Sequence, residues 1–481
     1  MKKYLPALYL ILITCMFAEN TPKIALVLSG GGSKGMAQVP TLQVIDSLNI
    51  PIDYVIGTSI GSITGALYSM GYSSDEILSE GLKTNWDIIY SNYKKRENLY
   101  FFQKNDYNKY PVIFNLKGIS PQAPMAITNG HASYMDLNSK FAVYELINDF
   151  NNFKIPFRCN AMDLLTGEEI IFDNGSISKA LRASSSIPSV FNPVDNDGSL
   201  LIDGGVCNNF PTDIAKKIGA DIVIGVNVSN SLRESSDINT IFDILRQTIS
   251  LNGLQKKIKN KDYVDILIEP QDLKSGSSYD NESLKNSYKS GQKAVYKEID
   301  KFLELQKKLN IENKSIILSS IKENDFIINN ILIKSNDNIN LNEIFPDYLY
   351  PFTISKESFL DKLSQIRKSK KYINFNYKLY DEVNGYKLIL YIEKKPSITI
   401  NNISIVGNKK LSESFIRDVL NINKDEQLDF NNLQSNIDKA YNLDLFDNIR
   451  YELENYNHNK VDLKFIIKEN ANNKMKVAAR W

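Results

Sequence analysis

A serine at position 59 stands in a pattern that can make it a nucleophile. The apolar residues 54–56 lead directly into Gly57–Gly61, whose sequence GTSIG sets Ser59 between two glycines, and apolar residues then recur at helical spacing. This order predicts a strand, a sharp turn and a helix, with the serine hydroxyl at the apex of the turn. Gly57 and Gly61 remove side chains that would collide in so tight a turn. Ser59 is therefore the candidate nucleophile.

A glycine-rich loop near the start of the chain can bind an anion. The apolar run 24–28 predicts a strand buried on both faces, and it is followed by Gly30, Gly31 and Gly32 and then by Lys34. Three glycines allow backbone N–H groups to converge on a negative group without obstruction, and Lys34 adds positive charge nearby. We expect this loop to hold something negative.

Nucleotide binding is an alternative interpretation of the same loop. Gly30, Gly32 and Gly35 fit the dinucleotide fingerprint G-x-G-x-x-G. That fingerprint expects an acidic residue at the end of the next strand to hold a ribose, and a Thr-Ser pair stands there instead, which weakens the interpretation. A P-loop fails because Lys34 precedes a glycine rather than Ser or Thr.

A nucleophilic serine needs a base, and the chain is short of histidine. Its two histidines are His131, which follows an Asn-Gly turn and is predicted to be an exposed loop residue, and His458, which lies in a polar, Asn-rich turn. A carboxylate is then the main candidate. The apolar run 200–202 ends in Asp203 and two glycines, which predicts an acid at a strand end, where a sheet presents functional groups. Taken alone, such an aspartate would be read as a turn or cap residue.

Together these segments resemble the patatin-like phospholipase family. Residues 30–35 are similar to its oxyanion motif, residues 57–61 to its nucleophile elbow and residues 203–205 to its catalytic aspartate motif, in the same order and at similar spacing. Residues 182–191 and 220–226 resemble two further blocks of the family.

The resemblance covers residues 23–305 and departs from the family pattern at Gln38, where many relatives have histidine. Pro40, in the first turns of the following helix, is tolerable there and would shift the loop slightly.

The resemblance implies a fold and a set of roles. The fold is a three-layer α/β/α domain, and the machinery is a Ser–Asp dyad with Ser59 as nucleophile and Asp203 as proton acceptor. The implied substrate is a phospholipid or other lipid ester at a membrane surface, with no cofactor and no metal ion. The implied oxyanion hole is formed by Gly30, Gly31 and Gly32, and motif support comes from Lys34, Gly35, Gly57, Gly61, Gly204 and Gly205.

Composition bounds the remaining possibilities. The 481 residues, 43% of them apolar, predict two or more domains with hydrophobic cores. Lys and Arg number 57 against 56 Asp and Glu, and this balance gives no reason to expect a nucleic-acid partner. Beyond residue 18 the sequence contains only Cys159 and Cys207, which we expect to be free thiols.

The N-terminus has the pattern of a signal peptide. Lys2 and Lys3 precede an apolar run over residues 5–17, which Ala18 closes. This predicts a signal peptide over residues 1–18 and export to the periplasm, the outer membrane or the cell surface.

Basic and aromatic side chains interleave between residues 92 and 114. The pattern suits a lipid–water interface and equally describes a solvated β-hairpin, which we favour.

The C-terminal third contains an internal repeat. Residues 325–333 and 397–405 are self-similar at a lag of 72 residues, and each is followed by helical stretches and an alternating strand. We predict two small α+β units, over residues 320–396 and 397–470. The second resembles a POTRA domain, and the first resembles it more weakly. The resemblance implies outer-membrane assembly machinery or a barrel protein as partner, because POTRA-type modules recruit chains at an exposed strand edge. The alternative to a binding role is that the two small units are only spacers.

A patatin-like domain followed by POTRA-like units resembles the type V patatin-like autotransporters, which continue into a membrane β-barrel. Residues 475–481 alternate as the first strand of a barrel would, so residues 471–481 are the predicted start of a barrel, but one strand cannot close it. Two explanations are compatible with the sequence: the reading frame is truncated, or this protein works without a barrel of its own.

The sequence thus favours an exported serine acyl hydrolase of the phospholipase A or lysophospholipase type, which cleaves lipid esters through an acyl-enzyme. The alternative is a non-catalytic outer-membrane assembly or binding protein that acts through the POTRA-like repeats. A dinucleotide enzyme is the third possibility.

Overall fold

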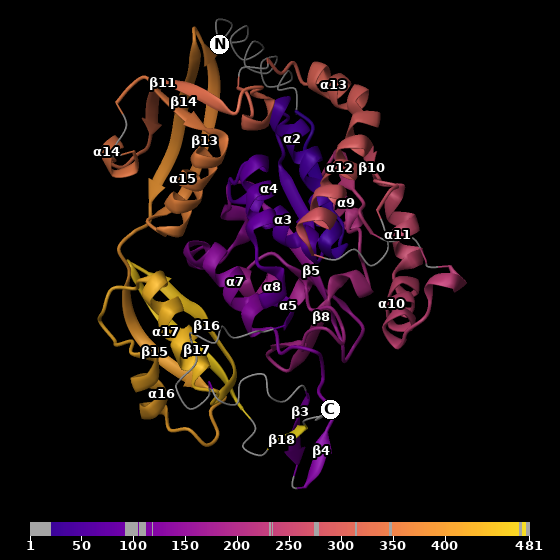
Figure 1. Ribbon diagram of the computed structural model, residues 1–481, viewed down its shortest axis with the longest axis vertical. Helices are drawn as coiled ribbons and strands as arrows, with labels where there is room; N and C mark the ends of the chain where they lie inside the picture. The colour runs from indigo at the N-terminus through magenta and orange to yellow at the C-terminus, as the bar shows by residue number, and fades with distance from the viewer. Residues whose placement is uncertain are drawn as a thin grey trace, which may run out of the picture.

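An eight-stranded sheet forms the centre of the N-terminal part of the chain (Figure 1). Its strand order is β10-β9-β1-β2-β5-β8-β7, with β6 paired to β5. The first five strands of this order are parallel, and β6 and β8 pair antiparallel with β5. The strands are β1 Ile24–Leu28, β2 Tyr54–Gly57, β5 Phe157–Asp163, β6 Glu169–Phe172, β7 Val194–Asn196, β8 Ser199–Asp203, β9 Ile222–Val226 and β10 Ile266–Ile268.

The computed structural model describes most of the chain. The described residues are 21–91, 104, 112–117, 119–229, 232, 234–273, 279–312, 315–345, 349–470 and 474–477. The predicted signal peptide, residues 471–473 and 478–481 of the predicted barrel start, and most of the basic and aromatic stretch 92–114 lie outside these residues.

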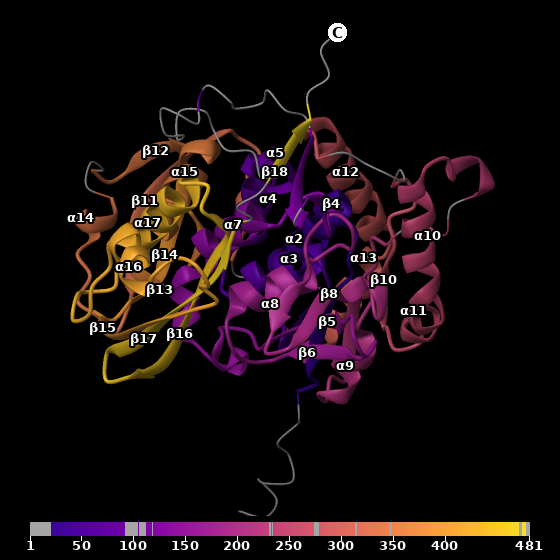
Figure 2. The ribbon, with the colours of Figure 1, turned by 90° about the horizontal axis from the view of Figure 1, so that it is seen from below.

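Helices cover both faces of the sheet. Ala25 and Val27 of β1 pack with α9, whereas Leu26 and Leu28 pack on the opposite face with α2 and α3. Figure 2 shows α9 on one side of the strands and α2 and α3 on the other. The predicted three-layer α/β/α fold is confirmed. The helices are α2 Val39–Ser47, α3 Ile60–Ser69, α4 Ser74–Lys83, α5 Trp86–Ser91, α7 His131–Phe141, α8 Ile177–Ser184, α9 Thr212–Lys217, α10 Ile241–Asn252, α11 Leu254–Lys261, α12 Asn281–Lys297 and α13 Ile299–Lys308.

Two small α+β units lie along one side of this domain (Figure 1). The first unit has the sheet order β12-β11-β14-β13, and the second has the order β15-β17-β16. The first consists of β11 Asp325–Lys334, α14 Leu341–Ile344, β12 Phe352–Ser355, α15 Lys356–Lys368, β13 Tyr372–Glu382 and β14 Gly385–Lys394. The second consists of β15 Thr399–Val406, α16 Glu413–Leu420, α17 Phe430–Asn442, β16 Phe446–Asn457 and β17 Lys460–Glu469.

The two units share a detail of strand pairing. In each, the first strand pairs parallel with the last, and the last two strands form an antiparallel hairpin. The parallel register shifts between Ile328 and Asn330 in the first unit and between Ile400 and Asn402 in the second. These positions are separated by the same 72-residue lag found in the sequence. A bulge at equivalent positions supports the repeat that the sequence indicates.

Both units pack against the α/β domain. The buried core of the second unit is continuous with that of the α/β domain, and the Tyr134 hydroxyl of α7 donates to the Tyr451 carbonyl oxygen of β16 at 2.8 Å. Arg367 of α15 is buried between the first unit and α4. It donates to Glu76 at 2.6 Å and stacks 3.6 Å above the ring of Tyr72. The pairing of a buried arginine with a buried carboxylate makes this contact specific.

A small sheet joins the chain end to the α/β domain. Strand β3 Val112–Lys117 pairs antiparallel with β4 Ser120–Gln122 and with β18 Lys474–Val477. Among the described residues, no helix has the length and apolar character needed to cross a membrane.

Candidate active site

The predicted strand, turn and helix are present around Ser59. Strand β2 ends at Gly57, α3 begins at Ile60, and Ser59 between them has φ 54° and ψ −126°, a strained conformation for a residue other than glycine. A Cβ atom added at Gly57 would lie 2.3 Å from the Gly61 carbonyl oxygen, and one added at Gly61 would lie 2.3 Å from the Leu28 carbonyl oxygen. Both glycines are needed because the backbone comes so close to itself here.

The structure brings Ser59 and Asp203 together. The Ser59 hydroxyl donates to Oδ2 of Asp203 at 2.6 Å, and the backbone N–H of Gly205 donates to Oδ1 at 2.7 Å. Both side chains are buried, with 6% exposure for each residue. Burial raises the pKa of Asp203 from its ordinary value of 3.8 to about 6, although the hydrogen bonds from Ser59 and Gly205 oppose this effect. The carboxylate is thus ionised near neutral pH and is a stronger base than an exposed aspartate.

The glycine loop passes directly beside Ser59. A Cβ atom on Gly30 would lie 3.0 Å from the Ser59 Cβ atom, and one on Gly31 would lie 2.9 Å from the carbonyl oxygen of Val228. The Gly30 N–H already donates to the Asn209 carbonyl oxygen at 3.2 Å. Of the three glycines, Gly31 and Gly32 therefore carry the amides that remain open to a ligand.

The supporting residues of the motifs lie in the same region. Lys34 is buried and borders the cavity that contains Ser59. Gly35 allows the loop to pack on the start of α3, because a Cβ atom there would lie 2.4 Å from Ile60 Cγ1. Gly204 makes a similar close approach to the Asn160 carbonyl oxygen, at 2.4 Å.

The block over residues 182–191 holds the aspartate strand in place. Arg182 is buried and donates to Ser186 Oγ at 2.5 Å, and the Ser186 carbonyl oxygen accepts the Asp203 N–H at 2.9 Å. Burial lowers the pKa of Arg182 to about 10. From the same block, Ser184 Oγ accepts the Ser59 N–H at 3.0 Å. The family resemblance pointed to this block, but the sequence did not indicate these individual contacts.

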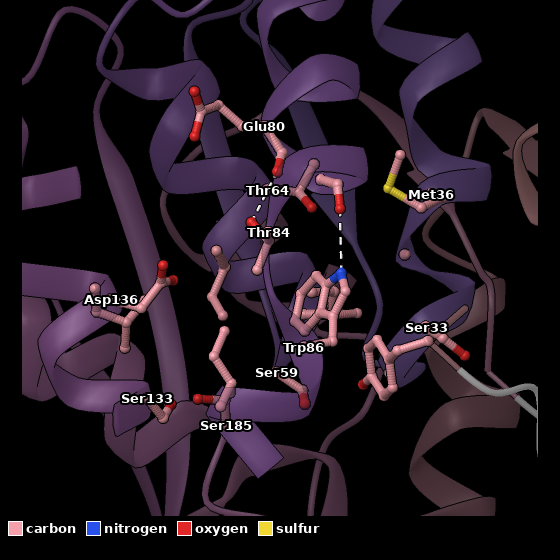
Figure 3. A pocket seen from close by; sticks show the side chains of 18 of the residues that line it. Ser33, Met36, Ser59, Thr64, Glu80, Thr84, Trp86, Ser133, Asp136 and Ser185 are labelled. Carbon is pink, nitrogen blue, oxygen red and sulfur yellow. Dashed lines mark hydrogen bonds between the residues drawn. The ribbon is translucent and has the colours of Figure 1, made fainter. Parts of the chain in front are cut away.

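Ser59 lies at the junction of two cavities. One, of about 910 Å³ including space open to solvent, is mostly apolar and runs between α3, α4, α5 and α7. Figure 3 shows Ser59 at one end of it and Glu80 toward the other. The second, of about 1960 Å³ including open solvent, contains Asp203, Gly30, Gly31 and Gly32 on its wall. An apolar chain and a polar group can therefore meet at Ser59.

Sequence reasoning did not find the residues that line the apolar cavity. Their helical periodicity is the same for a packed core as for a cavity wall, so the sequence carries no signal that separates the two. The apolar lining includes Met36, Val39, Ile60, Ile63, Leu67, Ile77, Trp86, Ile89, Tyr90, Leu137, Phe191 and Tyr279.

The histidines lie elsewhere. His131 was predicted to be an exposed loop residue, and this is wrong: it is the first residue of α7, is 3% exposed, and stacks on Tyr441 of α17 with ring centroids 3.6 Å apart. His458 lies in the turn between β16 and β17. Both histidines belong to the described part of the chain, and neither of them lines either cavity at Ser59.

The remaining groups that could react or bind a metal ion are the cysteine thiols and clusters of His, Cys, Asp and Glu side chains. Cys159 and Cys207 are free thiols, as predicted, and burial raises the pKa of each. Within the described residues, no group of three or more His, Cys, Asp or Glu side chains could hold a metal ion.

Comparison with known proteins identifies two parts of the chain. Residues 26–216 match the model of the patatin-like phospholipase family, and residues 398–470 match the POTRA model, described as a surface antigen variable number repeat. Lysophospholipase NTE1 of Meyerozyma guilliermondii is 29% identical over 207 residues, which cover 43% of this chain and 13% of the relative. Patatin-like phospholipase domain-containing protein 7 of Mus musculus is 28% identical over 234 residues, covering 46% of this chain and 14% of the relative. The chain thus spans about one seventh of the length of these relatives.

Solved structures show more distant similarity. VipD from Legionella pneumophila matches with a TM-score of 0.32 and 14% identity over 58% of this chain and 67% of its own. The POTRA3-5 segment of BamA from Haemophilus influenzae matches with a TM-score of 0.25 and 14% identity over 30% of this chain and 61% of its own. These two family matches show that this chain carries a patatin-like phospholipase domain followed by a POTRA domain.

Proposed function

We propose that the chain is a serine hydrolase of lipid carboxylic esters, with phospholipids or lysophospholipids as substrates, and that Ser59 and Asp203 form its catalytic dyad. The observation that carries this proposal is the 2.6 Å hydrogen bond from the Ser59 hydroxyl to a buried carboxylate, at the junction of an apolar and a wider cavity. The match of residues 26–216 to the patatin-like family and the lysophospholipase relatives support the substrate class.

The proposed reaction has two steps. Ser59 Oγ attacks the ester carbonyl carbon while Asp203 accepts the hydroxyl proton, and the tetrahedral intermediate collapses to an acyl-enzyme as that proton passes to the leaving alcohol. Asp203 then takes a proton from a water molecule, the water oxygen attacks the acyl carbon, and the proton returns to Ser59 Oγ as the carboxylic acid leaves. The raised pKa of Asp203 suits a group that accepts and returns a proton near neutral pH.

The proposed oxyanion hole consists of the amides of Gly31 and Gly32. The third glycine of the motif serves the loop conformation, because the Gly30 N–H is engaged by the Asn209 carbonyl oxygen. Loss of one oxyanion donor typically costs about 10²–10³ in rate. A side chain at Gly31 would collide with the Val228 backbone, so Gly31→Val should be severe without removing a reacting atom.

The test is release of fatty acid from phospholipid vesicles. Ser59→Ala and Asp203→Asn should each remove nearly all turnover, and the double variant should be scarcely worse than either, because residues that act as a unit are not additive. A fluorophosphonate should label the wild type at Ser59. Ser69→Ala, at a buried serine of the same helix that lines neither cavity at Ser59, is the matched control. Full activity of Ser59→Ala would overturn the proposal.

We also propose that the protein is exported and acts at or near the outer membrane. The signal-peptide pattern over residues 1–18 and the POTRA match over residues 398–470 support this location, and the latter supports contact with outer-membrane assembly machinery. Cell fractionation tests this location, and uncleaved protein in the cytoplasm would contradict it.

An assembly or binding role without catalysis is the second candidate function, and it also rests on the POTRA match. If Ser59→Ala restored every property lost on gene deletion, this second candidate would be favoured.

A further inference from the structure

Helix α10 carries three large apolar side chains that are exposed among the described residues. Ile244, Leu245 and Leu251 are 56%, 40% and 50% exposed, and Ile244 and Leu251 lie on one face of the helix. Gln247 and Ser250, on the adjoining face, line the wide cavity that contains Ser59. A surface helix ordinarily turns its apolar face inward, so this outward apolar face calls for a contact outside the chain.

A second group of exposed apolar residues lies in a segment that also reaches this cavity. Ile119, at the turn between β3 and β4, is 96% exposed, and Met125 and Ile127 are 63% and 65% exposed. Ile127 lines the same wide cavity as Gln247 and Ser250. In Figure 1 α10 lies at the right edge of the domain, and the β3–β4 hairpin lies at its lower end. Two separate segments that reach the wide cavity therefore carry exposed apolar side chains.

Lysines lie next to this surface. Helix α11, which follows α10 directly, carries Lys256, Lys257, Lys259 and Lys261 and no acidic residue. Lys256 pairs with Glu169 at 2.5 Å and Lys261 pairs with Glu269 at 2.6 Å, so the positive charge that supports an anionic partner comes from Lys257 and Lys259. Lys257 also lines the wide cavity. Lysines beside an exposed apolar helix face are the pattern of a segment that lies in the interface of an anionic membrane.

We propose that the α10 face, defined as Ile244, Leu245 and Leu251, and the hairpin rim, defined as Ile119, Met125 and Ile127, together dock the protein on an anionic phospholipid bilayer. This inference rests on the proposed function, since it brings the mouth of the Ser59 site to the surface where lipid esters lie. A substrate molecule then passes from the bilayer into the apolar cavity without crossing water, and its acyl chain avoids the cost of hydration.

The experiment separates docking from catalysis. The full chain with Ser59→Ala is sedimented with sucrose-loaded vesicles of phosphatidylethanolamine and phosphatidylglycerol. Two further changes on the α10 face, Ile244→Glu with Leu251→Glu, should lower the vesicle-bound fraction about tenfold or more, and Ile119→Glu with Met125→Glu should do the same. The matched control is Val383→Glu, at a residue 87% exposed in the first small unit, which should leave binding unchanged.

The same changes are then made with Ser59 intact. They should leave hydrolysis of a soluble short-chain ester unchanged and lower hydrolysis of vesicle lipid, because none of the four side chains lines the cavities at Ser59. The docking proposal is overturned if the Ser59→Ala protein does not bind vesicles, if all variants bind them equally, or if the Val383→Glu control loses binding to the same extent. It is also overturned if the changes abolish only self-association, measured by size-exclusion chromatography, and leave vesicle binding intact. Absence of soluble-ester hydrolysis in the wild type refutes the proposed function instead.

Discussion

Replacement of Asp203 by asparagine should make the protein both inactive and more stable. Asp203 is 6% exposed, and its pKa lies at about 6 because burial disfavours the charged form. At neutral pH the folded protein therefore holds an ionised carboxylate that burial makes less favourable than it is in the unfolded chain. An asparagine has nearly the same shape and cannot ionise, so it removes this unfavourable charge.

The magnitude follows from the two pKa values. The difference between 3.8 in the unfolded chain and about 6 in the folded protein corresponds to about 3 kcal/mol of lost stability above pH 6. Because the folded protein binds this proton more tightly, the wild-type free energy of unfolding should fall as pH rises from about 4 to about 6. The pKa of about 6 already includes the opposing effect of the hydrogen bonds from Ser59 and Gly205. We therefore expect Asp203→Asn to be about 2–3 kcal/mol more stable than the wild type at pH 7 and nearly equal to it at pH 4.

The rate should follow the same ionisation in the opposite direction. Only ionised Asp203 can accept the proton of Ser59, and with a pKa of about 6 the ionised fraction is about one tenth at pH 5 and about nine tenths at pH 7. The wild-type kcat/KM should therefore rise about tenfold between these pH values and then level off.

Two assays check this prediction. Urea unfolding of the wild type and Asp203→Asn across the pH range measures the stability difference, and hydrolysis of a soluble ester measures kcat/KM. The reasoning is refuted if the variant is less stable than the wild type at pH 7 and the difference does not depend on pH. It is also refuted if the wild-type rate is flat down to pH 5, or if the acidic limb disappears in His131→Ala.

Four further predictions follow from single contacts. Gly61→Ala should abolish activity or folding, because its Cβ atom would lie 2.3 Å from a carbonyl oxygen of β1. The control Gly253→Ala, at a residue with φ −86° whose Cβ atom would meet nothing closer than 3.5 Å, should fold normally in a circular-dichroism comparison. Arg367→Ala should lose about 3–5 kcal/mol in urea unfolding, because it leaves a buried carboxylate unpaired. Leu67→Trp, which fills part of the apolar cavity, should shift the preferred acyl chain of soluble esters to shorter lengths while butyrate hydrolysis persists. His131→Ala should keep its fluorophosphonate labelling but melt at a lower temperature, since it removes a buried ring stack.

Local patterns in the sequence were enough to predict the strands and the turn that position the site, whereas the three-layer fold was implied by the family resemblance. The buried strand β1, the turn at Ser59 and the strand that ends in Asp203 each occupy a few consecutive residues, so apolar runs and glycines mark them directly. The 72-residue repeat was equally visible because both copies keep the same strand pairing and the same bulge.

Contacts between distant segments were beyond the reach of these patterns. His131 is buried by Tyr441, and Arg367 is buried against Glu76, and no local rule links residues so far apart in the chain. The role of Gly30 shows the same limit. Its glycine character is local, but whether its N–H is open depends on the carbonyl oxygen of Asn209. Packing across the whole fold decides such features.

The separation between Ser59 and Asp203 has a consequence for biosynthesis. The glycine loop and the turn at Ser59 are complete within the first two strand-and-helix units, whereas Asp203 follows 144 residues later and enters the sheet beside β5. A nascent chain thus contains its serine long before its base, and the hydroxyl stays an ordinary alcohol during that interval. The hydrogen bond from Ser59 to Asp203 can form only once β8 has been added, so under the proposed mechanism a partly made chain lacks the base that ester hydrolysis requires.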